Sequence, residues 1–157
     1  VLFGLEVSAT LQFVGDRAFE EMETRRQFAA LVEPSIVVSV ALIVGEKFQA
    51  GHSTTQREIA DRTGIAEQVV ALIIRELSMA GVLHRLEREQ NSVCLAIPPD
   101  QVMTDRLLDI GFRIADEGGE RWVSSFAARL RDQQRAIAAK VPLASLLTTS
   151  ARPAGSA

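Results

Sequence analysis

Cysteine, tyrosine and histidine are scarce in this chain of 157 residues, which has one cysteine, no tyrosine and two histidines. The single cysteine, Cys94, excludes an internal disulfide and indicates a reducing compartment. It falls within an expected strand, where we interpret it as a small buried apolar group rather than a reactive thiol. Together with His52 and His84 it lacks the short paired spacings of metal ligands, so we expect no metal site.

No charge of one sign dominates the chain, and no long apolar run is present. The net charge of −3 argues against a general binder of nucleic acid or of anionic membranes. Residues 36–44 are nearly all apolar, but a membrane span needs roughly 18 to 20 such residues, so a buried helix is expected there. No basic segment precedes the apolar start, so we expect no signal peptide. The chain begins at Val1 without Met, and we therefore expect a fragment.

The residue patterns of catalysis are also missing. Gly118-Gly119 is not followed by the Lys-Ser or Lys-Thr of a phosphate-binding loop. The carboxylates within residues 20–23 lie on a charged helix face, where solvation explains them better than acid–base chemistry. Ser124-Ser125 has no histidine near it in the sequence. We therefore expect a non-enzyme without catalytic residues or a cofactor.

The most informative stretch, Thr54 to Leu95, predicts a winged helix-turn-helix in a mainly α fold. Thr55-Gln56-Arg57-Glu58 is a capping-box pattern, in which the Thr and Glu side chains bond each other's free amides, and Gly64 supplies a sharp turn. The expected elements are a helix from Thr55 through Arg62, a second from Ala66 to Met79 that stops at Gly81, and a two-stranded wing of Val82–Leu86 and Val93–Ile97.

The second helix of this motif would read DNA in most winged helices. Its apolar positions at i, i+3, i+4 and i+7 predict a buried face made of Val70, Ile73, Ile74 and Leu77. The opposite face would then hold Gln68, Ala71, Leu72, Arg75 and Met79.

The charges near that face do not favour DNA binding. The ionised residues of the helix sum to −1, and in the wing Arg85 and Arg88 are cancelled by Glu87 and Glu89. Because DNA affinity depends on Lys and Arg neutralising phosphates, no basic patch is predicted here. Apolar Leu72 and Met79 favour a protein contact instead.

Additional helices flank the motif. We expect an N-terminal helical segment over 1–33, a winged-helix domain over 34–117, an amphipathic helix over 118–141 and a disordered tail over 142–157. Within these, Ser35 is the expected cap of a helix that extends to Gln49. Trp122, Phe126, Leu130 and Ile137 lie along one side of the last helix; we interpret this stripe as core first, and as a dimer or partner interface second.

Residues 1–11, Val-Leu-Phe-Gly-Leu-Glu-Val-Ser-Ala-Thr-Leu, resemble the end of the last membrane helix in the YihY/BrkB family of bacterial inner-membrane proteins. Gly4, Glu6, Val7 and Leu11 fit the family pattern, Leu5 replaces a small Ala, and Ser8 stands for Thr. Some members continue into a cytoplasmic winged-helix tail, and members are often labelled ribonuclease BN. The resemblance implies a tail at the cytoplasmic face of the inner membrane.

A second resemblance covers Thr55 to Ile110 and is to the Rrf2 type of winged-helix regulator. It is carried by Glu58-Ile-Ala-Asp-Arg-Thr-Gly-Ile65, Leu77-Ser-Met-Ala-Gly-Val-Leu83, and Ala96-Ile-Pro-Pro99 with Thr104-Asp105 and Leu107-Leu108. Many Rrf2 proteins hold an iron–sulfur cluster with three cysteines and have a glycine-rich basic wing. This chain has one cysteine, and Arg88-Glu89-Gln90-Asn91 at the wing.

Three functions follow as hypotheses. The first is a non-catalytic cytoplasmic tail of a YihY/BrkB-like protein that contacts the membrane-embedded part or a partner through Leu72, Met79, Trp122 and Phe126. The alternative is a soluble dimeric Rrf2-like regulator that approaches DNA with Gln68, Arg75, Arg85 and Arg88. The third is a component of an RNA-processing nuclease.

Overall fold

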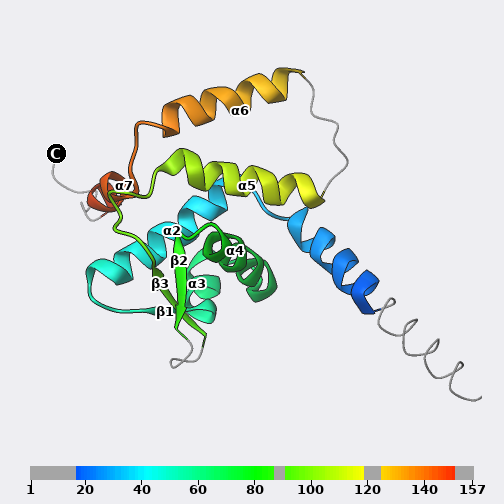
Figure 1. Ribbon diagram of the computed structural model, residues 1–157, viewed down its shortest axis with the longest axis horizontal. Coiled ribbons are helices and arrows are strands. Elements are labelled where there is room, and N and C mark those ends of the chain that lie inside the picture. Colours follow the sequence, from blue (N-terminus) through cyan, green and yellow to red (C-terminus); the bar gives the residue numbers. More distant parts are fainter. Residues whose placement is uncertain (1–16, 87–90, 119–124, 151–157) are drawn as a thin grey trace, which may run out of the picture.

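Helices and one small antiparallel sheet make up the computed structural model (Figure 1), which describes residues 17–86, 91–118 and 125–150. The helices are Arg17–Ala29, α2 (Pro34–Gln49), α3 (Gln56–Thr63), α4 (Glu67–Met79), α5 (Thr104–Gly118), α6 (Ser125–Ala138) and α7 (Leu143–Ser150). The strands are β1 (Thr54–Thr55), β2 (Leu83–Leu86) and β3 (Ser92–Leu95). The order helix, turn, helix, hairpin confirms the predicted winged helix-turn-helix.

Local sequence signals explain where the helices of the motif begin and end. The Thr55 hydroxyl accepts a hydrogen bond from the Glu58 backbone N–H at 3.2 Å, as expected for an N-cap. The reciprocal bond of the capping box is not formed, because the Glu58 carboxylate accepts from the Thr54 hydroxyl and pairs with Lys47. Gly64 and Gly81 have φ of 72° and 71°, the left-handed conformation that ends α3 and α4.

The expected cap of α2 at Ser35 is wrong by two residues. Glu33 is the N-cap, and Pro34 takes the first helical position. Proline suits that position because its fixed φ matches the helix and its missing N–H would have no partner there.

The sheet has three strands rather than the two expected. Its order is β1-β3-β2, with Thr54 opposite Val93 and Leu83 opposite Leu95. The extra strand is two β-branched residues directly before α3, which add to the free edge of the wing. Two residues are too short to show any alternation in the sequence, so no pattern predicted this strand.

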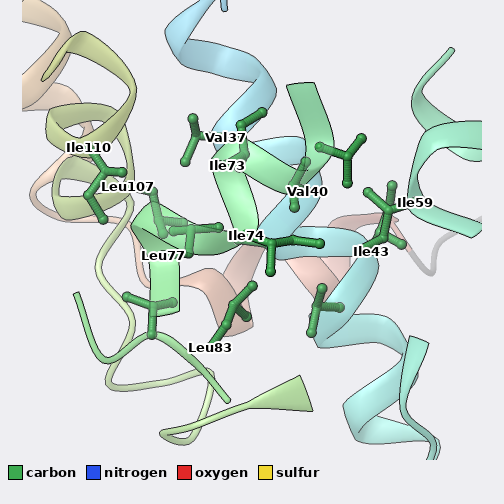
Figure 2. Packing of buried hydrophobic residues seen from close by; sticks show 14 of the residues in the cluster. Val37, Val40, Ile43, Ile59, Ile73, Ile74, Leu77, Leu83, Leu107 and Ile110 are labelled. Atoms are coloured by element: carbon green, nitrogen blue, oxygen red, sulfur yellow. The ribbon is translucent and has the colours of Figure 1, made fainter. Parts of the chain in front are cut away.

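One apolar core joins α2, α3, α4, α5 and the wing. Figure 2 shows Val37, Val40 and Ile43 of α2 gathered around Ile73, Ile74 and Leu77 of α4, with Ile59, Leu83, Leu107 and Ile110 at the edges. The predicted buried face of the second helix is therefore confirmed. Burial of each such side chain contributes about 1.5–3 kcal/mol, so this cluster is the main source of stability.

The helix formed by residues 143–150 corrects that part of the expected disordered tail, while residues 151–157 lie outside the described residues. Residues 143–150 form α7, whose Leu143 and Leu147 are buried against Gly45 of α2. The Thr104 backbone N–H donates to the Val141 carbonyl at 3.1 Å, which ties the entry of α7 to the start of α5. The small and hydroxyl residues of this segment suggested disorder, but Leu143 and Leu147 pack against α2 and order the helix.

The core interpretation of the stripe on the last helix is wrong for its described residues. Phe126 is 72% exposed, and Leu130 and Ile137 are also exposed, while Trp122 lies outside the described residues. The opposite side of α6 faces α5 through Arg131 and Arg135, as detailed below. The polar face of this amphipathic helix thus packs inward because α5 offers carboxylates to it.

Candidate nucleic-acid interface

The exposed side of α4 is the surface on which a winged helix would read DNA. Gln68 and Arg75 are exposed, Ala71 is half-buried, and Met79 is 70% exposed. Arg85 is exposed on β2, the first arm of the wing, and Arg88 lies outside the described residues. The structure therefore brings together Gln68, Arg75 and Arg85 from the four positions expected to approach DNA.

Leu72 is not part of an exposed apolar stripe, which corrects the expectation from the sequence. Only 8% of it is exposed, although it lies on the side of α4 away from the Ile73 face. Helix Arg17–Ala29 lies alongside this part of α4, and both contribute to one groove of about 640 Å³. Because the flanking helix covers Leu72, this leucine is not available on the exposed face of α4.

A buried ion pair joins the flanking helix to α4. Glu76 is 3% exposed, and its carboxylate lies 3.0 Å from the Arg25 guanidinium and 3.7 Å from that of Arg113 on α5. Arg25 also contacts Glu117 at 2.9 Å. A buried carboxylate without a cation is strongly unfavourable, so these contacts fix where helix Arg17–Ala29 can sit.

Sequence reasoning missed both residues of this ion pair. The available signal was Glu76 itself, which follows Ile73 by three positions and therefore borders the apolar face of the helix. A charge at the edge of a buried face requires a partner, but the partner lies 51 positions away along the chain, and no local pattern identifies it.

Two cations that contact or belong to α3 are already neutralised, whereas Arg57 of α3 is exposed and in none of the ion pairs found among the described residues. Lys47 pairs with Glu58 at 2.6 Å, and Arg62 pairs with Glu46 at 2.7 Å. The hydrogen bond from Lys47, followed by that from Thr54, lowers the pKa of Glu58 below its ordinary value. None of the ion pairs found within 17–86, 91–118 and 125–150 involves Arg75 or Arg85. On the exposed face of α4 and on β2, these two arginines therefore remain available to an anion.

The contact between α5 and α6 is also built from charge. Arg131 lies 2.9 Å from the Asp116 carboxylate, and Arg135 pairs with Asp109. Both guanidinium groups lie over the Phe112 ring, at 4.9 and 5.4 Å from its centroid. The hydrogen bond to Asp109 raises the pKa of Arg135 above its ordinary value. The outward face of α6, with Phe126 at one end, is left exposed to solvent.

The residues that could hold a metal do not assemble into a site in the part of the chain that the structure describes. No group of three or more His, Cys, Asp or Glu side chains there has the arrangement for an ion. His52 and His84 are exposed, and Cys94 is half-buried rather than buried as expected.

The described helices are short compared with a membrane span. No single helix among them is long and apolar enough to cross a bilayer. Helix Arg17–Ala29 and α2 meet the length and composition criteria only when taken together, across a bend of 89°.

The structure is similar in fold to solved structures of bacterial regulators. Oxidised CymR of Staphylococcus aureus is similar with a TM-score of 0.59 at 13% identity, covering 73% of this chain and 91% of that one. CymR (YrzC), the global cysteine regulator of B. subtilis, has a TM-score of 0.57 at 15% identity and covers 74% of this chain and 93% of its own. IscR of T. potens has a TM-score of 0.53 at 19% identity and covers 77% of this chain and 85% of its own.

These similarities confirm the winged-helix fold of the Rrf2-type regulators. No protein-family model matches the sequence, and no curated protein is significantly similar to it.

Proposed function

We propose that this chain is a winged-helix regulator that binds duplex DNA through the exposed face of α4 and the first arm of the wing. The observation that carries this proposal is the convergence of Gln68, Arg75 and Arg85 on one face, where neither arginine has an acidic partner among the described residues. The fold supports it, because the second helix of a helix-turn-helix is the one that enters the major groove.

Each of the three side chains has a distinct role in this proposal. Arg75 and Arg85 neutralise phosphates, and Gln68, in the first turn of α4, is placed to contact base edges. The burial of Leu72 makes the face more polar than the sequence indicated. Two unpaired arginines nevertheless predict weak binding, with a slope of about −2 for log K against log salt concentration.

Fluorescence anisotropy of a labelled mixed-sequence duplex tests this proposal. We expect the chain to bind the duplex at low salt. We expect the slope of log K against log salt concentration to become smaller in magnitude by about one for Arg75→Ala and for Arg85→Ala. Arg129→Ala is the matched control, because it removes the same charge from an exposed position on α6. The absence of binding at low salt, or an equal loss of DNA affinity in Arg129→Ala, would refute DNA binding by this face.

A second candidate function is favoured by the exposed stripe of α6. Phe126, Leu130 and Ile137 form an apolar surface on a helix that packs inward through arginines, as an interface for a protein partner or a second copy requires. With the resemblance of residues 1–11, this supports the tail of a YihY/BrkB-like membrane protein that acts by protein contact. Met79 of α4 is also exposed and would offer a second, separate point of contact.

The complete native gene product separates the two candidates. Several apolar spans encoded before Val1 and a product that sediments with membranes would support the membrane tail. A start codon beside Val1 and a product that stays in the supernatant would contradict it. Light scattering of the purified chain gives its oligomeric state. If a second copy covers the α6 stripe, Leu130→Ser should shift the dimer toward the monomer.

A further inference from the structure

The groove between helix Arg17–Ala29 and α4 has the size and the two-sided lining of a small-molecule site. Its volume of about 640 Å³ is within the range of roughly 300–1,000 Å³ that ligand sites occupy. Met22 and Phe28 contribute apolar surface from one wall, and Ala71 and Leu72 contribute it from the other. The groove is thus an open, largely apolar hollow between two helices.

Cations line the same groove. Arg75 and Arg85 both contribute to the lining, and neither has an acidic partner in the described part of the chain. Glu21 is the acidic side chain in the lining, so arginines outnumber carboxylates there. An apolar hollow with unneutralised arginines beside it is complementary to a molecule that has an apolar body and an anionic end.

A third arginine in the lining is held by the protein itself. Arg25 also lines the groove, and its terminal nitrogen is engaged by Glu76 and Glu117. Its Nε–H, however, is buried and has no acceptor among the described residues. This nitrogen is closed off from the groove, so the exposed Arg75 and Arg85 are the arginines that a ligand carboxylate would reach.

We infer that this groove binds a free carboxylic acid with an apolar tail, whose carboxylate is held by the two exposed arginines and whose tail lies along Met22, Phe28 and Leu72. A carboxylate fits better than a neutral lipid because the cations would remain unpaired beside an uncharged ligand. A small polar anion fits less well, since it would leave the apolar walls in water. The inference does not depend on DNA binding, although the two functions share Arg75 and Arg85.

Isothermal titration of the full chain with three probes tests the ligand class. Octanoate has both the carboxylate and the tail, acetate has only the carboxylate, and octanol has only the tail. We expect octanoate to bind at least about tenfold more tightly than either of the others, because a charged hydrogen bond is lost with octanol and apolar burial is lost with acetate. Equal binding of octanoate and octanol would overturn the inference.

Variants locate the site. Arg75→Gln and Arg85→Gln should each weaken octanoate by about tenfold, while Arg129→Gln on α6 should leave its affinity unchanged. Ala71→Trp should abolish binding by filling the groove, and circular dichroism shows whether that variant folds. If Ala71→Trp does not fold, the two exposed arginine variants still decide the matter: octanoate binding that survives both would refute the assignment. If octanoate binds and DNA does not, only the proposed regulator function is refuted.

Discussion

Removing Arg25, which neutralises Glu76, should destabilise the protein more than removing any other single surface arginine. Breaking a buried ion pair by deleting one partner costs about 3–5 kcal/mol. Arg25 keeps 32% of its side chain exposed, and Arg113 remains 3.7 Å from the Glu76 carboxylate as a second cation. Both facts reduce the penalty, and we expect Arg25→Met to lower the free energy of unfolding by about 2 kcal/mol.

Urea unfolding followed by circular dichroism measures this change, with Arg26→Met as the matched control. Arg26 is the neighbouring arginine on the same helix, is exposed, and has no ion pair within the described ranges. The double variant Arg25→Met with Glu76→Leu removes both charges and should recover to within about 1 kcal/mol of the parent. If Arg25→Met and Arg26→Met unfold at the same urea concentration, Glu76 does not need Arg25 and the reasoning fails.

Three further predictions concern packing and pH. Leu147→Ala should cost about 2–5 kcal/mol in thermal or urea unfolding if α7 belongs to the core, and a surface-like change below about 0.5 kcal/mol would contradict this. Gly111→Ala should cost about 1–3 kcal/mol, because the new Cβ would lie 2.7 Å from the backbone of Pro34; unchanged stability would show that α2 and α5 can separate there. The lowered pKa of Glu58 predicts a contribution to stability that is present above the carboxyl's ordinary pKa and lost as the pH falls through the lowered value; Lys47→Met should flatten that part of the pH–stability curve.

Periodicity and local capping predicted the elements of the motif because their causes lie within a few residues. The apolar spacing of Val70 to Leu77 is set by one helix against one core, and Gly64 and Gly81 are required where the chain turns left-handed. The predicted winged helix and its buried face followed from these signals alone. The expected boundaries of the domains remain predictions.

The site was less predictable because it depends on contacts between distant segments. Exposure of Gln68 and Arg75 followed from the helix period, but the burial of Leu72 depends on a helix that starts about fifty positions earlier. The α6 stripe was misassigned for a similar reason. An amphipathic pattern does not reveal which face packs inward, and here Asp109 and Asp116 of α5 attract the polar one.

The way α6 is held makes it easier to detach from the native fold than the helices of the apolar core. Among its described side chains α6 buries only Ala138, and carboxylates and one aromatic ring hold the rest of it to α5. Salt weakens such a contact while leaving the apolar core intact. Because α7 is anchored beyond it by Leu143, α6 can detach as a cooperative unit between fixed ends, and its amides would exchange with solvent long before those of α2.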